Sequence, residues 1–185
     1  MDRRVKYTKN LIEDTFLNLL EKKDIGSITV TEICEIADIN RATFYRYYID
    51  IYDLLKNIQD SFVSEIVNSD AMNDLPNYTI YDYTKEILKI FLNNKKLVKL
   101  LFDTNNNIYF INDVLDIAYE KLINKWLEAF PSSNEEEIEF AVVYIFNGAL
   151  GIINYWIKND FEQDIDTISN YIKEFTLDGI RKYIR

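Results

Sequence analysis

The sequence predicts an all-α fold, and three observations support that class. Only 4 glycines and 2 prolines occur among 185 residues, whereas a strand-rich fold needs many turns. Apolar residues recur at i, i+3 and i+4 along most of the chain, which is the spacing of amphipathic helices. Ser, Thr, Asp and Asn, the residues that cap helices, stand where this spacing breaks. The hydrophobic fraction of 48% is enough for roughly nine helices to build a core.

The first four helices are expected at 5–23, 30–37, 41–47 and 51–68. Thr29 and Glu32 predict a capping box at the start of the second helix, where a hydroxyl and a carboxylate bond free backbone N–H groups. Asn40 is placed to cap the third helix, and Asp50 with Asp53 to cap the fourth.

Five further helices are expected in the rest of the chain, near 79–93, 95–104, 109–129, 134–158 and 165–184. Asparagine-rich breaks and a Pro-Ser-Ser run separate them. Ser133 and Glu136 predict another capping box, at the start of the helix near 134–158.

Composition excludes several classes of function. The chain contains no histidine, which excludes Ser-His-Asp and Cys-His catalysis and zinc sites of the HExxH type. Cys34 is the single cysteine, so we interpret it as a small apolar residue in a reducing cytoplasm. The first residues are charged and are not followed by the apolar run of a signal peptide. We expect no enzymatic activity, metal site or cofactor.

Charge is distributed unevenly along this acidic chain, whose net charge is −10. Residues 1–60 carry 9 Lys or Arg against 11 Asp or Glu, a net charge of −2, whereas residues 61–185 carry 12 against 20, a net charge of −8. The cations of the first third are clustered near its start and again at Arg41 and Arg46. Local cationic clusters of this kind favour contact with a polyanion.

The segment NRATFYRYYID, residues 40–50, concentrates two arginines and four aromatic rings. It follows a short helix and the turn Asp38-Ile39-Asn40, in which Asp38 is expected to adopt a positive φ. Two short helices joined in this way form a helix-turn-helix, whose second helix can lie in the major groove of DNA. Phe44 and Tyr48 share one helix face, and we expect them to pack inward against Ile33, Ile36 and Ala37.

The residue types on the opposite face suit DNA. Arg bonds guanine edges or phosphates, Thr offers a hydroxyl and a methyl group to bases, and a Tyr hydroxyl bonds phosphate oxygens. Ala42 permits close backbone approach. Arg3, Arg4 and Lys6 are expected to form a mobile cationic arm suited to backbone or minor-groove contacts. The alternative is an ordinary three-helix subdomain with an aromatic surface.

The run ITVTEICEIADINRATFYRYYIDIYDLL resembles the DNA-binding signature of the TetR family of bacterial transcriptional regulators, and the match extends over about residues 5–58. The resemblance implies a helix-turn-helix head at 1–49 and a larger helical ligand-binding and dimerisation domain at 50–185. With the chemistry above, it predicts DNA contacts at Arg3, Arg4, Lys6, Thr29, Arg41, Ala42, Thr43, Tyr45, Arg46, Tyr47 and Lys56.

Three residues depart from the family's pattern. Asp38 replaces the turn glycine, and Tyr48 replaces the phenylalanine that ends the recognition helix. Ile51 replaces the lysine that opens the next helix and holds a phosphate, and Lys56 lies one turn further along. The loss of that lysine favours weaker DNA binding or a function that has moved away from DNA.

Residues 140–157 form an uncharged run of 18 positions. A membrane span needs about 20 apolar residues, and this run contains Asn147, Asn154 and two glycines, so we expect a helix buried on all sides instead. The family resemblance implies that this helix and the last one dimerise as a four-helix bundle. The predicted interface residues, each of which could equally fill the protomer core, are Leu150, Ile153, Ile157, Ile168, Ile172 and Phe175.

The resemblance also implies an effector cavity among the middle helices. Aromatic side chains with few polar groups suit a small apolar or aromatic effector, although such rings often only fill a core. The candidates are Phe62, Phe91, Phe102, Tyr109, Tyr119, Trp126, Tyr144 and Asn147.

The sequence therefore predicts a cytoplasmic, homodimeric transcription factor, a ligand-responsive repressor that binds a pseudo-palindromic DNA operator. The alternative is a dimeric protein–protein adaptor or coactivator of the same fold that has lost DNA binding. A small-molecule-transforming enzyme is a third hypothesis, which the absence of histidine disfavours.

Overall fold

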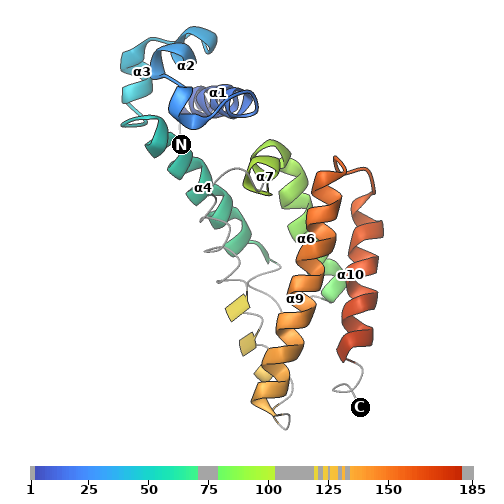
Figure 1. The fold of residues 1–185 in the computed structure, drawn as a ribbon. Coiled ribbons are helices and arrows are strands. Elements are labelled where there is room, and N and C mark those ends of the chain that lie inside the picture. The colour runs from blue at the N-terminus through green and yellow to red at the C-terminus, as the bar shows by residue number, and fades with distance from the viewer. Residues whose placement is uncertain are drawn as a thin grey trace. The chain divides into compact units, whose positions relative to one another are not determined.

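The computed structural model describes residues 3–70, 79–102, 119–120, 123–124, 126–128, 131 and 134–180. All regular secondary structure in these ranges is helical (Figure 1), as the sequence predicts. The chain divides into two compact units, Met1–Ser64 and Glu65–Arg185. This division falls in the last turn of the helix Ile51–Val67. The boundary predicted from the sequence, between residues 49 and 50, lies just before the start of the same helix.

The first unit contains the helices α1 (Arg3–Leu20), α2 (Val30–Ile36), α3 (Arg41–Tyr45) and most of α4 (Ile51–Val67), with a short 3-10 helix η1 (Ile25–Ser27) before α2. Each α-helix begins and ends within a few residues of its predicted bounds. α2 packs on α1 and on α3. Apolar side chains at helical spacing on α1 and α4 are buried, among them Ile12, Phe16, Leu54 and Ile58.

The helix caps form largely as predicted. The Asn40 side chain accepts a hydrogen bond from the Thr43 backbone N–H (2.7 Å), and Asp50 accepts one from the Asp53 N–H (2.8 Å). The Asp53 carboxylate accepts one in turn from the Ile49 N–H (2.8 Å). These bonds satisfy backbone donors that have no partner within the helix.

The capping box of α2 forms only in part. The Thr29 hydroxyl accepts a hydrogen bond from the Glu32 N–H (3.2 Å). The Glu32 carboxylate pairs instead with the Lys23 ammonium (2.6 Å), because the turn after α1 brings that cation within reach.

Two expectations for the first unit are wrong. Ile36 is 60% exposed, so it does not join the buried Ile33 and Ala37 in the expected contact with Phe44 and Tyr48. It is the last residue of α2 and lies off the helix face that buries Ile33 and Ala37. The expected mobile arm is instead the first turn of α1, since the helix already begins at Arg3.

The second unit contains α6 (Ile80–Asn93), α7 (Lys95–Phe102), α9 (Glu135–Lys158) and α10 (Ile165–Ile180). α10 packs on both α6 and α9, and α7 packs on α9, an arrangement visible in Figure 1. The helix predicted at 109–129 lies mostly outside the described residues, and the parts of it that are described at 119–120, 123–124 and 126–128 are helical.

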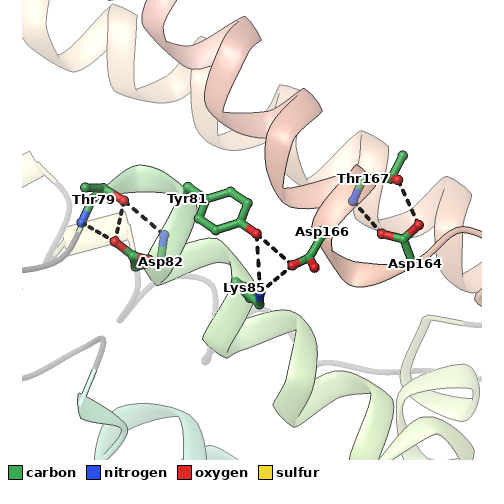
Figure 2. Close-up of polar contacts among 7 residues, drawn as sticks. All are labelled: Thr79, Tyr81, Asp82, Lys85, Asp164, Asp166 and Thr167. Atoms are coloured by element: carbon green, nitrogen blue, oxygen red, sulfur yellow. Dashed lines mark hydrogen bonds and ion pairs between the residues drawn. The ribbon is translucent and has the colours of Figure 1, made fainter.

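Polar contacts fix the start of α6 and its contact with α10 (Figure 2). Thr79 and Asp82 form a full capping box at the start of α6. The Lys85 ammonium (2.5 Å) and the Tyr81 hydroxyl (2.7 Å) both contact the Asp166 carboxylate at the start of α10. α9 is capped by Asn134, whose side chain accepts from the Glu136 N–H (3.0 Å). The predicted capping residue Ser133 lies outside the described residues.

Candidate nucleic-acid interface and regulatory surfaces

Two aromatic side chains hold α3 against the protein interior, as predicted. Phe44 and Tyr48 are buried, and their ring centroids lie 5.7 Å apart. The Tyr48 hydroxyl donates a hydrogen bond to the Glu13 carboxylate on α1 (2.7 Å). Burial, together with this bond, raises the pKa of Tyr48 well above its usual value, so the phenol stays protonated. The residue that replaces the usual phenylalanine therefore joins α3 to α1.

The opposite face of α3 is exposed. Arg41, Ala42, Tyr45 and Arg46 all lie at the surface, as the helical spacing predicts. Arg41 and Tyr45 interact across one helical turn: an Arg41 guanidinium N–H donates to the Tyr45 hydroxyl (3.4 Å). The Tyr45 ring also packs edge-to-face on Phe44, with centroids 5.6 Å apart. The Tyr45 ring thus packs on the core, while the Arg41 guanidinium and the Tyr45 hydroxyl lie in solvent.

Thr43 and Tyr47, also predicted to contact DNA, are half-buried. The Thr43 hydroxyl donates to the Asn40 side chain (2.9 Å), so only its lone pairs remain for a ligand. The Tyr47 ring lies 5.9 Å from the Lys9 ammonium, and the Tyr48 ring lies 5.5 Å from it. Lys9, which sequence analysis left outside the DNA-binding set, therefore adds a cation beside the recognition helix.

The remaining predicted contact residues are exposed on other elements. Arg3, Arg4 and Lys6 lie on the first turns of α1, and Thr29 precedes α2, where its hydroxyl already caps the helix. Lys56 on α4 forms an exposed ion pair with Asp60 (3.2 Å), and such pairs are weak enough to exchange for another partner.

The position where the resemblance expects a lysine is part of the core. Ile51 is only 9% exposed and lies at the start of α4. Its neighbour Tyr52 is 57% exposed and has a hydroxyl that can bond a phosphate oxygen. Tyr52 is not among the predicted contact residues, although its position beside the departing Ile51 was a usable signal.

The predicted dimer residues require correction. Ile153, Ile157, Ile168 and Ile172 are buried within the protomer, because α10 packs on both α6 and α9, and α7 packs on α9. These four side chains therefore contribute to the protomer core. Leu150 is half-buried and Phe175 is exposed, and the expectation for these two remains a prediction. The exposed large apolar side chains of α9 and α10 are Phe140, Val143, Tyr144, Tyr155, Tyr171, Phe175 and Leu177.

Five of the eight predicted effector residues are buried or half-buried. Phe62 and Phe91 are buried, and Phe102, Tyr119 and Trp126 are half-buried. The Phe91 and Phe102 rings are 6.0 Å apart.

Two predicted effector residues are wrong. Tyr144 is 75% exposed and Asn147 is exposed, because both lie on the outer face of α9 and not toward its buried side. Tyr109 lies outside the described residues.

α9 is long and apolar enough, by length and composition alone, to cross a membrane, and 28% of its most apolar window is buried. The described residues contain no group of three or more Cys, Asp or Glu side chains that could hold a metal ion.

Two comparisons by sequence find transcriptional regulators. A TetR family described as "Transcriptional regulator C-terminal region" matches residues 78–178. The Bacillus subtilis (strain 168) protein called uncharacterized HTH-type transcriptional regulator YxbF is 32% identical over 93 residues. That stretch is 50% of this chain and 24% of the length of YxbF, so the similarity spans about a quarter of that relative.

Solved structures share the fold. The dihydroxyacetone kinase operon activator DhaS covers 95% of this chain over 97% of its own, with 21% identity and a TM-score of 0.66. The fatty acid degradation regulator FadR from Bacillus halodurans covers 94% of this chain over 96% of its own, with 16% identity and a TM-score of 0.70. A regulator from Aquifex aeolicus VF5 covers 90% over 96%, with 18% identity and a TM-score of 0.69.

Proposed function

We propose that this chain, which belongs to the TetR family of transcriptional regulators, binds double-stranded DNA through α3 and acts as a homodimeric, ligand-responsive repressor in the cytoplasm. One observation carries the proposal: Arg41, Tyr45 and Arg46 project from a helix whose other face is held by buried rings. A rigid helix with outward guanidinium and phenol groups is what major-groove binding requires.

The placement of the cations supports DNA as the partner. α1 has no acidic residue in its first turn but begins with two arginines, although positive charge at a helix N-terminus opposes the helix dipole. The charge of these arginines therefore does not stabilise α1 through its dipole. Contacts with a DNA phosphate backbone would offset the unfavourable interaction of these cations with the helix dipole.

The homodimer is proposed on the exposed apolar face of α9 and α10 rather than on the residues first predicted. Phe140, Tyr144, Gly148, Gly151 and Tyr155 are exposed along one side of α9, and their spacing of three to four residues forms a single stripe. Exposed apolar patches often mark protein–protein contact sites. On α10, Tyr171 and Phe175 are also exposed, with stacked rings 6.1 Å apart.

Two heads related by a twofold axis would read half-sites about 34–36 Å apart in the simplest helix-turn-helix geometry. An effector would regulate DNA binding only if it binds two states of the dimer unequally. Buried and half-buried rings such as Phe91 and Phe102 remain candidates to contact it.

Duplex DNA from the region flanking the protein's own gene tests this function. We expect wild-type protein to retard the duplex at low salt and Arg46→Ala to weaken binding by about tenfold or more, since a lost bidentate base contact costs roughly 1–3 kcal/mol. Lys22→Ala, at an exposed cation after α1, is the control and should bind as wild type. Equal affinity of Arg46→Ala and wild type would contradict the assigned role of α3.

The second candidate is a dimeric adaptor that has lost DNA binding. The buried Ile51, which replaces a phosphate-binding lysine, and the net charge of −10 favour it. A dimer that retards neither its flanking DNA nor a random-sequence duplex pool at low salt would support the adaptor and exclude the DNA-binding function.

A further inference from the structure

A pocket of about 310 Å³ lies between the end of α7 and the end of α9, lined by Lys99, Phe102, Ile157, Lys158 and Asp160. This volume is at the lower end of the range of small-molecule sites. Its residues differ from the predicted effector set, with which it shares only Phe102. Its apolar part is formed by the buried Ile157 and the half-buried Phe102 ring.

The pocket is cationic in an otherwise acidic unit. Lys99 and Lys158 contribute two positive charges, and Asp160 is the single acidic residue in the lining. The Lys99 ammonium pairs with the Asp160 carboxylate (2.5 Å), which lowers the pKa of Asp160. Among the described residues, Lys158 forms no ion pair. One ammonium group is therefore free and a second is held by an exchangeable partner.

The turn that carries Asp160 has a strained backbone. Asp160 and Phe161 have φ angles of 54° and 59°, in the left-handed region that non-glycine residues rarely adopt. Two such residues in sequence cost free energy and persist only where surrounding contacts hold them. Here the Trp156 indole N–H donates to the Gln163 carbonyl (2.7 Å), and the Trp156 and Phe161 rings pack edge-to-face at 4.8 Å.

The strained turn also positions a charged group. It directs Asp160 toward Lys99, whose ammonium lies 6.0 Å from the Phe161 ring. A lysine at the last position of α9 is favourable for the helix dipole, which accounts for Lys158 alone. The helix dipole does not explain why Lys99, the apolar Phe102 and Ile157, and the Asp160 carboxylate line the same pocket.

We propose that this pocket binds a small amphiphilic anion, with its apolar part on Phe102 and Ile157 and its anionic group between Lys99 and Lys158. The ligand anion displaces the Asp160 carboxylate from Lys99, so Asp160 competes with the ligand and lowers its affinity. If the proposed function holds, this anion belongs to the class of effectors that regulate it. Binding itself is measured without DNA, so failure here is distinguishable from failure of DNA binding.

The test uses two fluorescent probes that differ mainly in charge. Anilinonaphthalene sulfonate is an aromatic anion, and phenylnaphthylamine is its uncharged counterpart. We expect Lys99→Gln to weaken binding of the anionic probe by roughly tenfold, the effect of one lost charge-assisted bond. We expect Asp160→Asn to tighten it, because the substitution frees Lys99. Asn tolerates the left-handed conformation at least as well as Asp, so the turn is preserved.

The neutral probe and a matched lysine provide the controls. Lys89→Gln, at an exposed lysine on α6, should leave binding of both probes unchanged, and none of the variants should alter binding of the neutral probe. Thermal unfolding of each variant verifies the fold. Unchanged or weaker anion binding by Asp160→Asn, or equal losses for both probes in Lys99→Gln, would overturn the proposal.

Discussion

At the scale of single residues, one tyrosine hydroxyl connects the recognition helix region to α1. Tyr48 is almost fully buried, yet its hydroxyl has a partner in Glu13, 35 residues away in sequence. A buried hydroxyl without a partner would be destabilising. The departure from phenylalanine at this position thus links the recognition helix to α1.

Tyr48→Phe is expected to lower the free energy of unfolding by about 1 kcal/mol, the usual contribution of one hydrogen bond. Urea denaturation measures it, and Tyr45→Phe at the exposed ring serves as the control. Because burial raises the pKa of Tyr48, its contribution is complete below pH 10, the usual value for tyrosine, and declines as pH rises further. The difference between wild type and Tyr48→Phe should therefore shrink above pH 10.

Arg41 and Tyr45 are expected to act on DNA as one unit. The hydroxyl that accepts from Arg41 becomes a better donor to a phosphate oxygen, because bonded groups polarise one another. Arg41→Ala and Tyr45→Phe should each weaken DNA binding, and the double variant should lose much less than the two losses combined. Fluorescence anisotropy of a labelled duplex measures this cycle, and fully additive losses would show that the pair is not coupled.

At the scale of elements, α9 has one face inside the protomer and one outside. Trp156 is fully buried and Tyr155, its neighbour, is exposed. The same contrast separates Ile153 from Tyr144. Since the helix is apolar almost all round, only its packing against α7 and α10 distinguishes the two faces.

Two aspartate substitutions on α9 are expected to have different consequences. Ile153→Asp buries a charge in the protomer and should unfold it, whereas Tyr144→Asp should leave the helical content unchanged and give monomers. Circular dichroism measures the first effect and light scattering the second. A folded Ile153→Asp protein, or a dimeric Tyr144→Asp protein, would contradict this assignment of the faces.

At the scale of the whole molecule, the net charge of −10 makes DNA binding depend on a small number of cations. Every cation that contacts a phosphate adds to the salt dependence of affinity through counterion release. The acidic remainder of the chain repels DNA at long range. Affinity for unrelated DNA should therefore be low even at modest salt.

The salt dependence of DNA affinity measures the contribution of individual cations. Arg3→Gln and Lys6→Gln should each reduce the slope of log K against log salt concentration by about 1 and weaken binding equally on all sequences. Arg46→Ala should instead reduce discrimination between operator and unrelated DNA. A Lys6→Gln slope equal to that of wild type would remove Lys6 from the phosphate contacts.

Features that depend on neighbouring residues could be predicted well. The caps at Asn40 and Asp50 and the positive φ of Asp38 (50°) arise from groups within a few residues of one another. The outward face of α3 follows from its helical period, which is why its exposed residues were predicted correctly. The Thr79–Asp82 box was missed because aspartate stands where the usual pattern has Glu or Gln.

The sequence by itself determined the all-helical class, most helix bounds and the recognition helix, because backbone periodicity and capping are local. Tertiary structure alone decided which side of α9 faces solvent, that Ile51 is buried, and that Tyr48 bonds Glu13. It also brought Lys99 to Asp160, 61 residues away. These outcomes depend on which surfaces pack together, and an apolar residue at helical spacing satisfies either a core or an interface equally well.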